Sequence, residues 1–215
     1  MIPYERTRQQ TIPNSAVKII GVGGAGANML DRIALDGMEG AELLACNTDV
    51  RTLTSSVAPE KIQIGRNLTM GLGAGGDPDL GRQAAGEAEL ELRDALRDRK
   101  IIFICVGLGG GTGSGAAPLV ARLAREGGAF TVVFATTPFN FEGRRRREQA
   151  ENALKELRDK ARGRKPHKAL RDQISAARRQ VTMSRYYEDA ALLAEKLTRW
   201  SAKIPDPRRQ FVICS

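Results

Sequence analysis

The sequence predicts an α/β domain in which a parallel sheet is covered by helices on both faces, followed by a basic, partly helical C-terminal tail. Strand-like and helix-like segments alternate from Ala16 to about residue 160, which is typical of a parallel sheet. Three strand-like segments are continuously apolar, as expected for strands buried on both faces. Two of these end in glycine-rich turns that lead into helix-like segments, so the expected architecture is Rossmann-like.

The expected elements follow one another in strand–helix pairs. Strands are expected at Val17–Val22, Glu42–Asn47, Lys61–Ile64, Ile101–Val106 and Phe130–Thr136. Helices are expected at Ala25–Leu35, Val50–Ser56, Leu80–Arg97, Gly115–Glu126 and Arg144–Arg158. Beyond residue 160 the alternation stops, and the short apolar run Phe211–Cys214 has no evident partner. We therefore expect a flexible arm over 1–15, one domain over 16–160 and a tail of uncertain structure over 161–215.

Charge is distributed unevenly along the chain. The formal net charge is +9, yet residues 1–159 carry as many acidic as basic groups, so the whole excess lies in residues 160–215. Such an asymmetry predicts a basic arm or a segment of different origin. The tail has few aromatic residues and no nucleic-acid motif, so we expect no specific nucleic-acid partner and at most electrostatic contact with acidic surfaces.

Composition also excludes several classes of protein. No apolar run approaches the roughly 18 residues of a membrane span, and the first residues have no signal-peptide core. The 3 cysteines have no metal-binding or redox spacing, and the only histidine, His167, lies in the tail. We expect a cytoplasmic protein with reduced, buried thiols and no metal site.

The two glycine-rich turns predict an anion site. Gly21–Asn28 follows the first strand and Gly109–Gly115 follows the fourth. A turn of this kind points backbone N–H groups and the positive end of a helix dipole at the ligand, and glycine lets the backbone approach closely. One such turn is a weak signal, whereas two on neighbouring strands suggest a chain wrapped around a polyphosphate.

Three further segments belong to the same edge of the predicted sheet. A third glycine cluster, Gly71–Pro78, lies between the third strand and the long third helix and is a candidate phosphate contact. Asn47–Asp49 closes the second strand, where a helix cap and a polar contact to the ligand are both compatible with the sequence. The basic run Arg144–Arg147 lies at the start of a helix, where positive charge is unfavourable for the helix dipole. It is therefore either a solvated face or a group of side chains that interacts with a nearby anion.

These segments resemble the nucleotide-binding half of the FtsZ family, the bacterial cell-division proteins of the tubulin superfamily. The resemblance covers roughly Ser15 to Ala161 and rests on the order and spacing of the loops. The GGGTGSG form of the second turn is a specific tubulin-type signature, and the sequence PFNFEG that begins at Pro138 is nearly as characteristic of FtsZ.

The resemblance implies a GTP- or GDP-binding cell-division protein, with Mg²⁺ as an optional companion ion and FtsZ-like subunits, its own or a full-length relative's, as filament partners. Backbone N–H nests would replace the P-loop lysine as the phosphate cradle. The residues that it places against the nucleotide are Gly23, Gly24, Ala25, Gly26, Ala27, Asn28, Asn47, Ala74, Gly75, Gly110, Gly111, Thr112, Gly113, Ser114, Gly115, Glu142 and Arg146. Among these, Ala74 and Gly75 would sense the γ-phosphate, Glu142 would contact the sugar, and Arg146 would lie against the nucleotide.

The chain also departs from the family pattern. The family continues with a strand ending in a guanine-contacting Asn and a central helix whose Asp reads the base, and neither is evident after Arg158. A second domain then supplies an acidic loop that completes the hydrolytic site of the next subunit, and no such motif is present here. We therefore expect a homologue that is truncated or divergent after about residue 160, without catalytic residues of its own.

Two other functions remain open from the residues. Beside a GTPase that works with other subunits, the first alternative is a non-hydrolysing nucleotide-binding accessory protein. Alternatively, Gly21, Gly23 and Gly26 fit the fingerprint of a Rossmann dinucleotide-binding enzyme. Against that enzyme stand the second glycine turn, which its fold does not require, and Asn47 at the position of the acid that binds a ribose hydroxyl.

Overall fold

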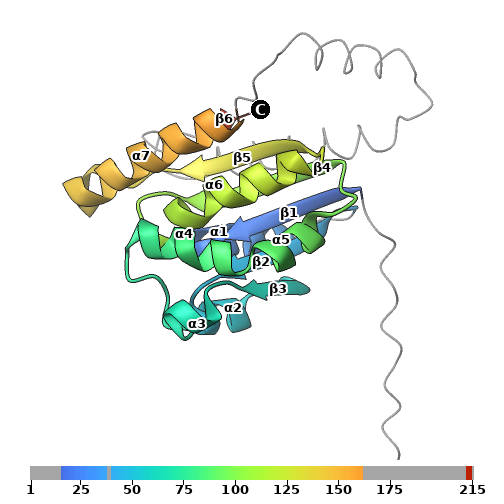
Figure 1. The fold of residues 1–215 in the computed structure, drawn as a ribbon, viewed down its shortest axis with the longest axis horizontal. Coiled ribbons are helices and arrows are strands. Elements are labelled where there is room, and N and C mark those ends of the chain that lie inside the picture. Colours follow the sequence, from blue (N-terminus) through green and yellow to red (C-terminus); the bar gives the residue numbers. More distant parts are fainter. Residues whose placement is uncertain (1–15, 38–39, 162–211, 215) are drawn as a thin grey trace, which may run out of the picture.

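One mixed sheet forms the centre of the molecule. The computed structural model describes residues 16–37, 40–161 and 212–214. The strands are β1 (Val17–Val22), β2 (Glu42–Asn47), β3 (Glu60–Gln63), β4 (Ile101–Gly107), β5 (Phe130–Thr136) and β6 (Val212–Cys214). Their order is β3-β2-β1-β4-β5-β6, and the first five are parallel (Figure 1). The expected parallel α/β architecture is confirmed for these five strands; the arm 1–15 and residues 162–211 and 215 of the tail lie outside the described residues.

Helices cover both faces of the sheet. One face carries α1 (Gly23–Leu35) and α2 (Val50–Ser55), whose apolar residues join one buried cluster. The other face carries α4 (Pro78–Glu87), α5 (Glu89–Leu96), α6 (Gly111–Glu126) and α7 (Arg144–Ala161), which join a second cluster (Figure 1). The helix α3 (Arg66–Thr69) and the 3₁₀ helix η1 (Asn140–Glu142) lie in the loops after β3 and β5. Nowhere in these described segments is a helix both long and apolar enough to cross a bilayer.

Alternation along β1 sends successive side chains to the two faces. Ile19 belongs to the cluster beneath α1, whereas Ile20 and Val22 belong to the cluster beneath α5 and α6. Lys18 points to the same side as Ile20 and is only 1% exposed. Its ammonium lies 2.6 Å from Glu60 and 3.5 Å from Glu42, and it donates to the carbonyl of Ala95 at 2.8 Å. The apolar run of β1 therefore contains one buried cation, which is paired with carboxylates from β2 and β3.

Several element boundaries differ from the expectation. The helix expected over Leu80–Arg97 is two helices, α4 and α5, that meet at Ala88. Gly86, a poor helix former, stands in the last turn of α4 just before the break. The helices α1 and α6 begin inside the glycine turns, at Gly23 and Gly111, because glycines assigned to loops from sequence alone take up the first helical turns.

The C-terminal stub also differs from the expectation. Val212–Cys214 was expected to have no partner, but it pairs antiparallel with β5, with Ile213 opposite Phe134. An edge strand presents unpaired backbone N–H and C=O groups, which an extended segment from elsewhere in the chain can satisfy. β6 thus covers the outer edge of β5.

Candidate functional site

The two glycine turns meet at one rim of the sheet. β1 and β4 are neighbours, with Val22 in register with Val106, so the turns that follow start at the same level. A Cβ added to Gly23 would lie 3.0 Å from the amide nitrogen of Gly113. The prediction that the two turns lie on neighbouring strands is confirmed, and their backbones are in direct contact.

Close backbone approach explains two of the glycines. A Cβ on Gly26 would lie 2.4 Å from the carbonyl oxygen of Cys105, and one on Gly113 would lie 2.3 Å from that of Gly107. Real Cβ atoms do not come so close, so any side chain at either position would push its helix away from β4. Glycine therefore lets α1 and α6 sit directly on the carboxyl ends of the strands.

The first turns of α1 and α6 present backbone donors to this rim. The first four N–H groups of a helix have no partner within it. Neither helix has a side-chain cap or an acidic residue in its first turn. The donors are the N–H groups near Gly23–Ala25 and Gly110–Gly113, joined by the positive ends of two helix dipoles. Such an arrangement favours an anion.

Some predicted site residues lie behind these donors. Gly26 and Ala27 are buried against the sheet, whereas Ala25 and Asn28 are exposed. Ser114 is buried, and its hydroxyl accepts a hydrogen bond of 2.8 Å from the Gly109 amide. A Cβ on Gly115 would lie 2.0 Å from the Pro78 carbonyl oxygen of α4. Ser114 and Gly115 thus shape the turn from within, and their contact with a nucleotide stays a prediction.

The third glycine cluster rests on the second turn. A Cβ on Gly111 would lie 2.9 Å from the Cβ of Ala74 and 2.8 Å from the amide nitrogen of Asp77. The Asp77 amide donates to the Ala74 carbonyl at 2.8 Å, which closes the loop, and the Asp77 carboxylate caps α4. Ala74 is buried and Gly75 is exposed with φ +56°. The structure thus brings the third cluster to the same rim.

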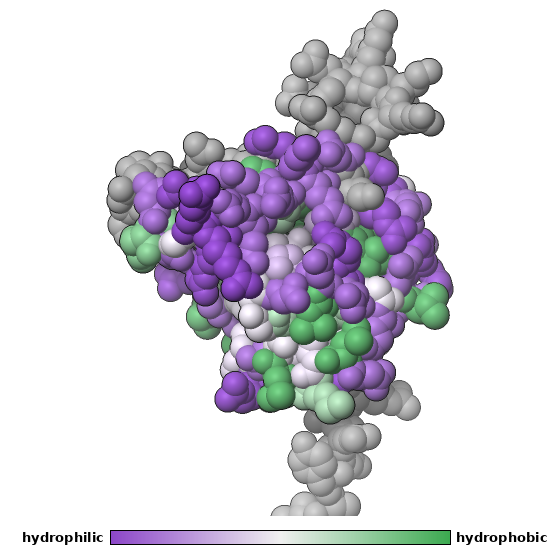
Figure 2. All heavy atoms as spheres, turned by 60° about the vertical axis from the view of Figure 1, so that its left-hand side comes forward, coloured by the Kyte–Doolittle hydropathy of each residue, from purple (hydrophilic) through white to green (hydrophobic). Residues whose placement is uncertain are grey.

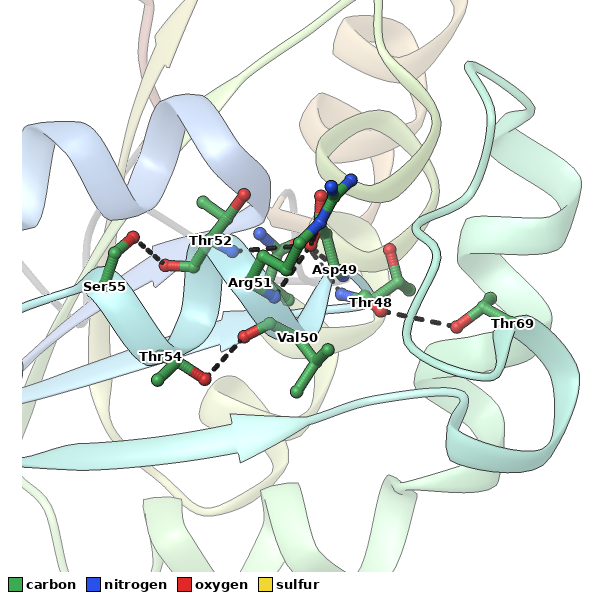
Figure 3. Close-up of polar contacts among 9 residues, drawn as sticks. Thr48, Asp49, Val50, Arg51, Thr52, Thr54, Ser55 and Thr69 are labelled. Carbon is green, nitrogen blue, oxygen red and sulfur yellow. Dashed lines mark hydrogen bonds and ion pairs between the residues drawn. The ribbon is translucent and has the colours of Figure 1, made fainter.

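Asn47–Asp49 joins β2 to α2 at this rim (Figure 3). The Asn47 side-chain oxygen accepts hydrogen bonds from the amides of Thr48 and Asp49, and Asn47 is 2% exposed. Asp49 is the helix cap, because its carboxylate accepts from the amides of Arg51 and Thr52. Of the two roles weighed for this segment, the structure gives the cap to Asp49 and uses the Asn47 oxygen in a tight turn.

The segment around η1 forms the remaining side of the rim. One Glu142 carboxylate oxygen accepts from the Phe139 amide at 2.8 Å, and the other accepts from the Arg146 guanidinium at 2.9 Å. A Cβ on Gly109 would lie 2.8 Å from the Arg146 carbonyl, so this segment packs against the second turn. The two side chains predicted to contact sugar and nucleotide are thus paired with each other beside the glycine turns.

The cysteines are buried, as predicted, on opposite faces of the sheet. Cys46 and Cys105 are free thiols, and burial raises the pKa of each to about 12. They are therefore neutral and unreactive at pH 7. Within the described segments no group of three or more potential metal ligands comes together, and His167 lies outside them.

One residue of the rim was missed by sequence reasoning. Thr48 is fully buried, and its hydroxyl lies 2.6 Å from the hydroxyl of Thr112 in the first turn of α6. The only signal in the sequence was its place between Asn47 and Asp49, at the end of a strand. A hydrogen bond between residues 64 positions apart cannot be read from spacing.

Known proteins resemble this chain in sequence and fold. Residues 16–163 match the Tubulin/FtsZ family, GTPase domain. A cell division protein FtsZ of Aquifex aeolicus is 50% identical over 143 residues, which cover 66% of this chain and 39% of that protein. The solved FtsZ dimer of M. jannaschii is 45% identical, with a TM-score of 0.65 over 66% of this chain and 42% of the other. The CetZ2 protofilament of Haloferax volcanii, bound to GTPγS, is 30% identical, with a TM-score of 0.61 over 67% and 46%.

These matches cover the part of the chain that builds the rim. The chain spans about two fifths of the length of the curated relatives that it matches. The family match begins at the residue before β1 and ends two residues after α7, so it contains all three glycine clusters, Asn47 and the Glu142–Arg146 pair. On the evidence of its fold, its glycine turns and its sequence, this chain belongs to the Tubulin/FtsZ family.

Proposed function

We propose that this chain binds GTP and GDP at the rim formed by its glycine loops, as an FtsZ-like cell-division protein. The observation that carries the proposal is the contact between two uncapped helix N-termini, those of α1 and α6, on adjacent parallel strands. Their N–H groups would bind the phosphates without a lysine. The third glycine cluster, packed on Gly111, would lie beside the terminal phosphate.

The remaining contacts in the proposal are made by side chains. Glu142 and Arg146 form an ion pair beside the second turn; in this proposal Glu142 would contact the sugar and Arg146 would lie against the nucleotide. Mg²⁺ would enter with the triphosphate, held mainly by phosphate oxygens and water. Ala25 and Asn28 are exposed on the first turns of α1 and would line the ligand.

Filament formation with FtsZ-like subunits is part of the same proposal. The CetZ2 structure named above is a protofilament with a GTP analogue bound. In the present chain, Leu68, Met70 and Leu72 are 45%, 79% and 79% exposed in and just after α3. Figure 2, which brings this rim forward, shows hydrophobic residues gathered on its lower part, below a surface of intermediate hydropathy. Burying them against another subunit beside the nucleotide would favour association.

Hydrolysis, in this proposal, needs another subunit. Water attack on a γ-phosphate requires positioning and charge stabilisation. The carboxylates nearest the loops already have structural roles, since Asp49 caps α2, Asp77 caps α4 and Glu142 binds Phe139 and Arg146. The resemblance to FtsZ assigns the missing acidic groups to a neighbouring subunit. Purified chain should therefore show no GTP turnover until a full-length relative is added.

Calorimetric titration of the full chain tests the binding proposal. GTP, GDP and NAD⁺ are added separately to the same protein. We expect both guanine nucleotides to bind with a stoichiometry of about one per chain and NAD⁺ not to bind. Tight binding of NAD⁺ without binding of GTP would instead support the dinucleotide enzyme and overturn the proposal.

A further inference from the structure

The buried hydroxyl of Thr48 lies at the junction of the three loops. It is 2.6 Å from the Thr112 hydroxyl in the second glycine turn. A Cβ on Gly73, in the third glycine cluster, would lie 4.0 Å from the same hydroxyl. Thr48 itself belongs to the segment that ends β2. One side chain with no exposed surface is therefore bonded to the second glycine turn and lies beside the third glycine cluster.

The burial of Thr48 decides the direction of this hydrogen bond. A hydroxyl has one proton to donate, and a buried donor without an acceptor costs about 1–3 kcal/mol. Among the described residues, the Thr112 oxygen is the acceptor within reach of the Thr48 hydroxyl. Either hydroxyl could donate by geometry, but burial favours Thr48 as the donor, and Thr112, which is partly exposed, then keeps its own proton for another acceptor. That proton can then point to the rim, beside the amides of Gly111 and Gly113 in the first turn of α6.

The backbone of the same segment holds the third loop. The Thr48 carbonyl accepts from the Thr69 hydroxyl at 3.4 Å, a long bond that Figure 3 shows together with the caps of α2. The Val50 amide donates to the Gly71 carbonyl at 3.0 Å, and Asp49 pairs with Leu72. The end of β2 is thus bonded to the second turn by a side chain and to the third loop by its backbone.

We propose that Thr48 is a positioning residue for nucleotide binding: its hydroxyl orients the Thr112 hydroxyl so that the latter donates to a phosphate oxygen. The inference rests on the proposed function, because it needs an anion at the rim. Thr48 does not touch the nucleotide. It acts by donating its own proton to the Thr112 oxygen, which restricts rotation of the Thr112 hydroxyl, so that the donor is oriented before the ligand arrives.

A double-mutant cycle in GTP affinity tests the proposal. The full chain carries Thr48→Val, Thr48→Ser, Thr112→Val or Thr48→Val with Thr112→Val, and each variant is titrated with GTP by calorimetry. Thr48→Val should weaken GTP binding by up to about tenfold, because a Thr112 hydroxyl that is no longer oriented loses at most about one net hydrogen bond to the phosphate. Thr48→Ser keeps the hydroxyl and should bind within about twofold of the unmodified chain. Because Thr48 acts through Thr112, Thr48→Val should change affinity less than about twofold when Thr112 is already Val.

The variants must also be compared for folding. A methyl group at the position of the Thr48 hydroxyl would crowd Thr112, so Thr48→Ala, which removes the contact without crowding, is measured beside Thr48→Val. Thermal unfolding without nucleotide shows which variants are folded. Full GTP affinity in a folded Thr48→Val or Thr48→Ala chain would overturn the inference, as would additive losses in the double variant. If the unmodified chain bound no GTP, the proposed function would fail, and the inference with it.

Discussion

Gly110→Asp should weaken anion binding at the second glycine turn without lowering the stability of the fold. Gly110 is the N-cap of α6, with φ −102° and ψ 177°, an extended conformation that any residue adopts. A Cβ there would meet nothing within 4 Å. Aspartate is also among the preferred N-cap residues and stabilises a helix by a few tenths of a kcal/mol relative to glycine. The variant should therefore fold at least as well as the unmodified chain.

The same side chain should oppose a phosphate in two ways. As a cap, its carboxylate would accept from the amide of Thr112 or Gly113, which are the donors that the phosphate needs. Its charge would also repel the ligand. At roughly 6 Å and an effective dielectric constant of about 20, two unit charges interact by about 3 kcal/mol. GTP affinity should fall roughly hundredfold or more.

Gly110→Asn is the matched control, since asparagine has the same shape and caps equally well without a charge. We expect it to lose about tenfold in GTP affinity, so the difference between the two variants isolates the charge. The assays are calorimetry with GTP for affinity and circular dichroism for thermal unfolding. Unchanged GTP affinity in a folded Gly110→Asp chain would refute the assignment of the second glycine turn as the phosphate site. Gly111 and Gly113 are poorer targets, because a Cβ at either would clash with backbone atoms.

Three further predictions concern base recognition and stability. The affinities of the purified chain for GTP and ATP should lie within about tenfold of each other, because backbone amides bind phosphates and do not distinguish bases. Competition titrations measure this ratio. A preference for GTP of several hundredfold would mean that another part of the chain recognises guanine. Lys18→Met should lower the free energy of unfolding by about 2 kcal/mol in denaturant titrations, because the Ala95 carbonyl loses its hydrogen-bond donor. Lys61 is exposed, so Lys61→Met should change the free energy of unfolding by less than about 0.5 kcal/mol. Above pH 9 the thiols of an unfolded chain ionise, while Cys46 and Cys105, with pKa values raised to about 12, stay protonated in the folded chain. The free energy of unfolding should therefore fall by roughly 1.4 kcal/mol per pH unit for each thiol between pH 9 and 12. An equally steep fall in a chain with both cysteines changed to Ala would contradict this cause.

Local patterns made much of this fold predictable. The strands β1, β2 and β5 have the predicted bounds, because each is a short aliphatic run between turn residues. The glycine turns were also recognisable, because two of them follow buried strands and lead directly into helix-like segments. Local patterns did not predict the residues at which α1 and α6 begin, because both helices start inside the glycine turns. A side chain at Gly23 would meet the second turn at Gly113, and one at Gly111 would meet the third glycine cluster at Asp77, so the need for glycine at these helix starts depends on contacts between distant parts of the chain.

Pairwise contacts account for the remaining differences. The first strand was predicted to be continuously apolar although it contains Lys18, and the burial of this lysine depends on carboxylates from β2 and β3. Val212–Cys214 pairs with β5, an edge that no feature of the stub itself identifies. Thr48 is similar, because its partner Thr112 comes from another strand–helix unit. The site was therefore predictable as a set of loops, but the hydrogen bonds that join the loops were not.

Backbone amide hydrogen exchange, with and without GTP, tests the central claim most directly. The account holds that the N–H groups of the two glycine turns bind the nucleotide. Exchange should slow at Gly23–Ala25 and Gly110–Gly113 when GTP is added to the full chain, and it should stay unchanged in α5, which packs on the sheet away from these turns. Slowed exchange confined to residues 161–215, with both turns unchanged, would contradict the account.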